Sequence, residues 1–178
     1  AATAVAQAPI PRIYRSAEQV FLPPASTNCS IVDTSTGLGD GVSCNDSATL
    51  TAFYFWTAFP YGATSASWGM KIAYETPAAT SVCAWDVALG ALIEGTTIDT
   101  ANATIVTVSN TSQAHSDDHV YLTNQATIGV RRLDTGGACN PAFGVCSQRP
   151  VRVDMKINST STTASACILK SIELIPVP

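Results

Sequence analysis

Three consecutive apolar segments decide the fold of this chain. Residues 50–59 read LTAFYFWTAF, residues 66–74 read ASWGMKIAY, and residues 82–93 read VCAWDVALGALI. Each segment is short, carries at least one tryptophan, and is followed within a few residues by proline or glycine. These features are typical of β-strands rather than helices. The three segments are therefore predicted to be the core strands of an all-β domain.

Further strand patterns lie on both sides of these three segments. They cover residues 10–22, 103–109, 120–130, 151–157 and 168–175, which gives about eight strands separated by turn signals. The fold predicted from this pattern is an eight-stranded antiparallel β-sandwich of jelly-roll type. An immunoglobulin-like sandwich is the alternative, although that fold is usually shorter.

A long loop is predicted between the first strand and the core strands. Residues 25–47 are rich in Ser, Thr, Gly and Asp and are predicted to be a long loop that carries two cysteines. Residues 88–94 are the segment most able to form a helical turn. The Ala-rich residues 1–11 are predicted to be an extended arm in front of a single domain at residues 12–178.

The composition excludes several classes of function. Only 12% of the 178 residues are charged and the net charge is −4, so binding to nucleic-acid phosphates is not expected. No run approaches the roughly 20 apolar residues of a membrane-spanning helix. No glycine motif leads from a strand into a helix, and no cofactor is predicted.

The six cysteines indicate an oxidising compartment, and therefore an extracellular or virion location. Their spacing does not match a zinc site. Fifteen pairings are possible in principle. The expected pairs are Cys29–Cys44 and Cys139–Cys146 as loop staples, which leaves Cys83–Cys167 to join two strands. The chain also carries five Asn-x-Ser/Thr sites for N-glycosylation, at Asn28, Asn45, Asn102, Asn110 and Asn158.

Side chains suited to metal binding are concentrated in one polar segment. His115, Asp117, Asp118 and His119 could bind a transition metal. The segment lies between strands, and a solvated polar turn is the favoured interpretation.

Catalytic groups are sparse. No Gly-x-Ser-x-Gly elbow is present. Asp86 and Glu75 are the best candidates for the paired carboxylates of a glycosidase, but both are also explained by outward-facing or hydrogen-bonded positions. The chain is therefore predicted not to be an enzyme.

Aromatic side chains on a sandwich can stack on sugar rings. Trp56, Trp68, Trp85, Tyr61 and Tyr74 are the candidates for such a platform. Bulky rings in central strands more often fill the core. Trp85 and Trp56 are therefore expected in the core, while Trp68 and Tyr61 are left open between the two roles.

The order of these features resembles a known family. The residues that carry the resemblance are 14–23, 53–56, 68–72, 82–87 and 169–174. Together they are similar to small jelly-roll structural proteins of tailed phages and related viruses. This resemblance implies a non-enzymatic, oligomeric subunit. The cysteine-bearing loops and the glycosylation sites depart from the family pattern, and they leave room for a secreted surface or filament protein.

Two functions are therefore expected. The first is a self-assembling structural subunit of a virion or extracellular filament, whose partners are copies of itself and whose arm adds a strand to a neighbour. Low charge favours it, because faces of Ser, Thr and Ala are easily desolvated. The alternative is a lectin-like, carbohydrate-binding module whose partners are glycans.

Overall fold

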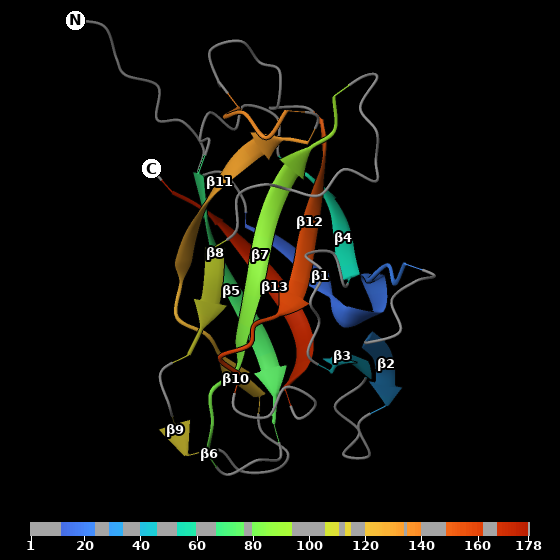
Figure 1. Cartoon of the computed structure of the whole chain (residues 1–178), viewed down its shortest axis with the longest axis vertical. Helices are drawn as coiled ribbons and strands as arrows, with labels where there is room; N and C mark the ends of the chain where they lie inside the picture. The colour runs from blue at the N-terminus through green and yellow to red at the C-terminus, as the bar shows by residue number, and fades with distance from the viewer. Residues whose placement is uncertain are drawn as a thin grey trace, which may run out of the picture.

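The computed structural model describes most of the chain. The residues described are 12–23, 29–33, 40–45, 53–59, 67–76, 80–93, 106–110, 113–114, 120–133, 135–139, 149–161 and 167–177. Within these ranges the chain forms thirteen strands and one three-residue 3-10 helix, and no α-helix (Figure 1). The predicted all-β class is thus confirmed.

The elements follow one another from β1 to β13. In chain order they are β1 (Ile13–Ser16), η1 (Ala17–Gln19), β2 (Cys29–Asp33), β3 (Asp40–Cys44), β4 (Phe53–Ala58), β5 (Ser67–Glu75), β6 (Thr80–Ser81), β7 (Ala84–Ala91), β8 (Val106–Ser109), β9 (Gln113–Ala114), β10 (Val120–Leu122), β11 (Ala126–Arg132), β12 (Pro150–Ile157) and β13 (Ile168–Pro176).

The strands form two layers of a sandwich. The first layer runs β2-β3-β13-β5, with β1 beside β13 and β10 beside β5. The second layer runs β7-β12-β4, with β8 beside β7. The short strands β6 and β9 pair separately. Among the strands that the structure describes, every pairing is antiparallel except that of β7 with β11.

Two segments connect the layers along their sides. Strand β11 pairs with β5 up to Gly129 and with β7 from Val130 onward. On the opposite side the chain leaves β1, turns through η1, and bridges to β4 at Phe21 and Tyr54 through two backbone hydrogen bonds of 2.8 and 3.1 Å. The sandwich is therefore close to a closed barrel.

The core follows from the alternation of each strand. Successive strand residues point to opposite faces, and in β5 the inward residues are Trp68, Met70, Ile72 and Tyr74, all fully buried. Every residue of strand β7 is buried. Both edges of this strand are paired, with β12 on one side and with β8 and β11 on the other.

Some details of the prediction are wrong. Residues 88–94 do not begin with a helical turn, since β7 continues to Ala91 as a central strand. The cysteine-bearing stretch 25–47, expected to be a loop, contains the hairpin β2–β3. The sheet is also divided into more than eight strands. Polar hairpin strands such as β2 lack the apolar alternation from which the others were predicted.

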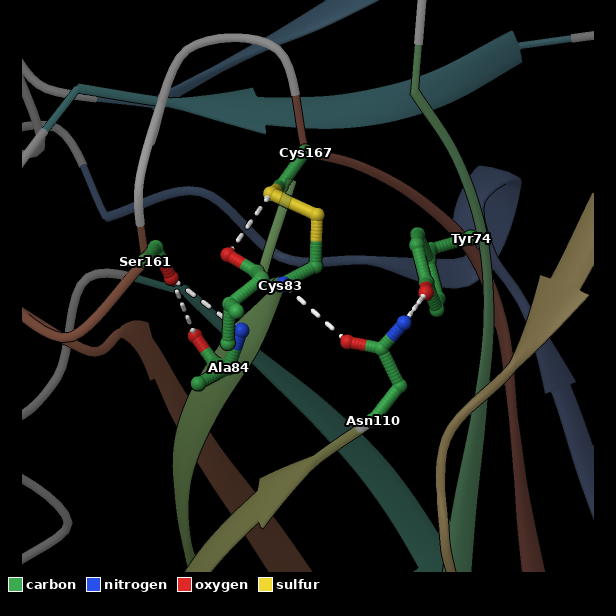
Figure 2. The surroundings of a disulfide bond; sticks show 7 residues. Tyr74, Cys83, Ala84, Asn110, Ser161 and Cys167 are labelled. Atoms are coloured by element: carbon green, nitrogen blue, oxygen red, sulfur yellow. Dashed lines mark hydrogen bonds between the residues drawn. A yellow bond between two sulfur atoms is a disulfide. The ribbon is translucent and has the colours of Figure 1, made fainter. Parts of the chain in front are cut away.

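Two of the predicted disulfides are present. Cys29 lies opposite Cys44 in the β2–β3 hairpin and is bonded to it. Cys83–Cys167 joins the start of β7 to the start of β13, and therefore links the two layers (Figure 2). Cys139 is also disulfide-bonded, but Cys146 lies outside the described residues, as does the arm predicted at residues 1–11. The Cys139–Cys146 pair stays a prediction.

Candidate functional site

A cleft opens where the chain crosses from β1 to β4, and we call it the β1–β4 cleft. Its volume is about 530 Å³. It is lined by Arg15, Glu18, Gln19, Val20, Phe21 and Trp56. Aromatic rings thus lie beside side chains that donate and accept hydrogen bonds, in a concave site at the side of the sandwich.

The polar rim of the cleft is shaped by η1. Ala17 is buried and anchors this turn, and Val20 donates a backbone hydrogen bond of 3.1 Å to the Ala17 carbonyl. The side-chain oxygen of Gln19 accepts a 3.2 Å hydrogen bond from the Ser16 backbone N–H, an interaction that helps to start a helical turn. Glu18 and Gln19 are consequently held at the surface.

Arg15 ties the two sides of the cleft together. Its Nε donates to the Trp56 carbonyl at 3.0 Å, and its Nη2 donates to the Thr57 hydroxyl at 3.2 Å. Its Nη1 donates to the Tyr14 carbonyl at 2.8 Å. A guanidinium carries five N–H donors in a planar fork. Within the described part of the chain, these three bonds fix the fork and leave two N–H groups for another acceptor.

The aromatic side of the cleft comes from the outward-facing positions of β4. Phe53 and Phe55 point into the core, so Tyr54 and Trp56 point outward and are half-buried. The rings of Phe21 and Tyr54 are stacked, with 5.4 Å between their centroids and 8° between their planes. Trp56 contacts Tyr54 edge-on, with 6.0 Å between the ring centroids. We call Phe21, Tyr54 and Trp56 the aromatic shelf.

The expected platform of five aromatic residues is not assembled. Trp68, Trp85 and Tyr74 are core residues with at most 1% of their surface exposed. Trp85 was expected there. Trp56 was expected in the core and lies instead on the outer face, because it is two residues from outward-facing Tyr54. Tyr61 lies outside the described residues.

The two candidate catalytic carboxylates are held apart. The neighbours Tyr74 and Trp85 point into the core, with ring centroids 5.4 Å apart, so Glu75 and Asp86 point to the opposite outer faces of the sandwich. Glu75 pairs with Lys170 at 3.1 Å. These two acids therefore do not form the facing pair that a glycosidase requires.

Asp86 instead contacts side chains of β8, of β12 and of the turn after β12. Its Oδ1 accepts hydrogen bonds from the Thr107 hydroxyl at 2.8 Å and from the Asn158 side-chain amide at 2.6 Å. Lys156 Nζ lies 3.7 Å from its other oxygen. Such a carboxylate, supplied with donors on both oxygens, has a structural role.

The metal candidates His115, Asp117, Asp118 and His119 lie outside the described residues. Among the residues that are described, no group of three His, Cys, Asp or Glu side chains could hold a metal ion. Metal binding at residues 115–119 therefore stays a prediction.

Two glycosylation candidates, Asn110 and Asn158, make side-chain hydrogen bonds to other residues of the fold. Asn110 is buried; its Oδ1 accepts from the Cys83 backbone N–H at 3.3 Å, and its side-chain N–H donates to the Tyr74 hydroxyl (Figure 2). Asn158 donates to Asp86 and accepts from the Thr160 N–H and hydroxyl. Glycosylation requires an accessible side-chain nitrogen, and both are engaged.

Among the other three glycosylation candidates, Asn45 lies in the described part of the chain. Asn45 is exposed after β3. Asn28 and Asn102 lie outside the described residues. Glycosylation at these three positions stays a prediction.

The Tyr74 hydroxyl in this network has a strongly shifted pKa. Burial raises the pKa of the Tyr74 hydroxyl to about 12, because the phenolate would lose its hydration. Ser161 closes the network on the other side of Cys83, since its hydroxyl donates to the Ala84 carbonyl at 3.0 Å and accepts from the Ala84 N–H at 3.1 Å (Figure 2).

The cleft residues Arg15, Glu18, Gln19 and Phe21 were not predicted as a site. The only local signal was the Ser16-to-Gln19 spacing of a helix start. Their meeting with Trp56 depends on a contact across about forty residues of chain, which a local pattern does not reveal.

Comparisons with known proteins identify no family: no family model and no curated protein matches this chain. A solved Cry1Da tryptic core variant of Bacillus thuringiensis is similar with a TM-score of 0.48 and 13% identity over 88% of this chain, which spans 22% of the toxin. A family 11 carbohydrate-binding module from Clostridium thermocellum, solved with a β-1,3-1,4-mixed-linked tetrasaccharide, gives a TM-score of 0.36 and 15% identity, covering 93% of this chain and 89% of that one. Likenesses this low are not evidence of function.

No helix in the described part of the chain is long and apolar enough to cross a membrane. The two disulfides are typical of proteins in an oxidising compartment, and are consistent with an extracellular location.

Proposed function

We propose that this protein is a carbohydrate-binding module without catalytic activity of its own, and that the β1–β4 cleft is its binding site. The observation that carries the proposal is the pairing of the Trp56 and Phe21 rings with Arg15, Glu18 and Gln19 in one cleft. A sugar presents apolar C–H faces that pack on aromatic rings, together with hydroxyl groups that both donate and accept.

The polar groups of the cleft complement hydroxyls in both directions. Arg15 only donates, ionised Glu18 only accepts, and the Gln19 amide can do both. The volume of about 530 Å³ lies within the range of roughly 300–1,000 Å³ found for small-molecule sites. These properties favour a short stretch of a neutral, hydroxyl-rich chain as the ligand.

A glycan array with the purified chain tests the proposal. We expect dose-dependent binding that weakens about 30-fold in Trp56→Ala, because loss of an aromatic anchor commonly costs about 2 kcal/mol or more. Phe21→Ala and Tyr14→Ala form a matched pair, since these side chains are 51% and 59% exposed and only Phe21 lines the cleft. Equal binding by these two variants, or an array without hits, contradicts the proposal.

A second candidate function is self-association through β10, as expected of a structural subunit of a virion or extracellular filament. Val120 and Leu122 on this strand are 50% and 60% exposed, whereas Tyr121 between them points inward and contacts Tyr74. Among the described strands β10 pairs only with β5. A strand with one such edge can pair with the same strand of a second copy about a twofold axis.

Sedimentation velocity across a wide concentration range tests this second candidate. We expect a dimer or larger species that the double substitution Val120→Lys and Leu122→Lys disperses. Deletion of residues 1–9 tests the arm separately, and should reduce particle size if the arm adds a strand to a neighbour. A wild-type chain that stays monomeric at high concentration excludes self-association.

A further inference from the structure

A buried ion pair lies next to the aromatic shelf. On β12, Val151 and Val153 point into the core, so Arg152 and Asp154 share the outer face. Arg152 Nε lies 2.6 Å from Asp154 Oδ1, and its Nη2 donates to Oδ2 at 3.0 Å. The side chains are only 5% and 0% exposed. The guanidinium is thus held against the carboxylate by one hydrogen bond and one close charge contact.

The ion pair reaches the cleft through Tyr54. In the β12–β4 register Arg152 lies opposite Trp56, and Asp154 lies opposite Tyr54. The Arg152 guanidinium carbon lies 5.8 Å from the centre of the Tyr54 ring, within the range of a cation–π contact. Tyr54 in turn contacts both Phe21 and Trp56, the aromatic residues that line the cleft.

A buried ion pair is weak evidence for stability, because apolar residues of similar volume often stabilise a fold equally well. Its two short contacts, however, fix where the cation lies against the Tyr54 ring. We infer that Arg152 and Asp154 are positioning residues for the β1–β4 cleft: they orient Tyr54 and, through it, the Phe21 and Trp56 side chains that contact the ligand. The inference deepens the proposed carbohydrate-binding function and rests on it for the identity of the ligand.

Acrylamide quenching of tryptophan fluorescence tests the positioning without any glycan. Trp68 and Trp85 are buried, so quenching reports mainly on half-buried Trp56. The double substitution Arg152→Met and Asp154→Leu removes the pair without leaving an unpaired buried charge. We expect a higher quenching constant, because the aromatic shelf loses its support, together with a melting temperature close to that of the wild type.

Two further variants keep the test decisive if the double variant does not fold. Arg152→Lys retains the charge and loses the planar fork, and should give an intermediate quenching constant. Lys156→Met removes the cation of the other ion pair on β12, which is 3.7 Å long and includes Asp86 rather than a shelf residue. This control should leave the quenching unchanged.

The glycan array supplies the second readout. Binding should fall about three- to tenfold in the folded double variant, the range expected when a cation–π contact is lost. It should fall by less in folded Arg152→Lys, which keeps the cation and loses only its fixed orientation. Unchanged quenching and unchanged array signals in folded Arg152→Lys overturn the inference. An array that is blank for every variant refutes the carbohydrate-binding function instead, and the quenching constants then decide the positioning role on their own.

Discussion

The two observed disulfides should contribute unequally to stability. Cys83–Cys167 closes a loop with a sequence separation of 84, whereas Cys29–Cys44 closes one of 15. In the chain-entropy model, cross-linking removes disorder from the unfolded chain in proportion to the logarithm of loop length. The model gives about 4.6 kcal/mol for the long loop and about 3 kcal/mol for the short one. The difference of about 1.5 kcal/mol is what the experiment must detect.

The perturbation is to replace each pair separately, as Cys83→Ala with Cys167→Ala and as Cys29→Ala with Cys44→Ala. Removing both partners avoids a free thiol that could form a wrong pair. The structure reinforces the expected order, because Cys83–Cys167 links the two layers, whereas Cys29 and Cys44 already face each other across the hairpin.

Urea unfolding followed by circular dichroism measures both losses. We expect the Cys83/Cys167 variant to lose more free energy of unfolding and to show the larger increase in denaturant dependence, since its unfolded state expands more. Equal losses, or a greater loss in the Cys29/Cys44 variant, would refute the reasoning that loop length dominates. Near-complete unfolding of both variants in water would be resolved by repeating the series with a stabilising osmolyte.

Three further predictions follow from the buried polar groups. The pKa of Tyr74 is raised in the folded state, so the un-ionised hydroxyl contributes stability that is present below pH 10 and is lost as the pH rises toward 12. Urea unfolding should therefore show that the free energy of unfolding falls by about 1.4 kcal/mol by pH 11. The Tyr74→Phe variant should lack this fall. Asp86→Ala should cost about 1–3 kcal/mol by stranding its donors, whereas Lys156→Met should cost under about 1 kcal/mol, and equal melting temperatures would contradict this. Glycopeptide mapping of chain secreted from a eukaryotic host should find Asn110 and Asn158 unmodified, and sugar at either would show that the fold is not as described there.

Much of the fold could be predicted because the core strands have clear local sequence patterns. In β4 the buried Phe53 and Phe55 alternate with the outward-facing Tyr54, and this alternation is visible in the sequence. The mostly apolar composition of β7 is equally visible. The Cys83–Cys167 link was reached by first assigning the close cysteine pairs. The same alternation places Trp56, which follows the buried Phe55, on the outer face. The expectation that Trp56 lies in the core relied on its large side chain instead.

The rest depends on contacts that local patterns do not contain. Lys170 is the extra residue of a β-bulge, between Leu169 and Ser171, and this places its ammonium group beside Glu75. The β1–β4 cleft likewise depends on contacts between distant segments, such as the hydrogen bond from Arg15 to the Trp56 carbonyl. Neither meeting follows from spacing, since each requires the register of strands that are distant in sequence.

The chemical shift of the Trp56 indole N–H tests the proposed binding function most directly. A nuclear magnetic resonance titration with the glycan that gives the strongest array signal should shift that resonance, while the indole N–H groups of buried Trp68 and Trp85 remain in place. Trp56→Phe identifies the resonance by its loss. If the glycan binds and the Trp56 signal does not move, or if no glycan binds at millimolar concentration, the β1–β4 cleft is not a carbohydrate site.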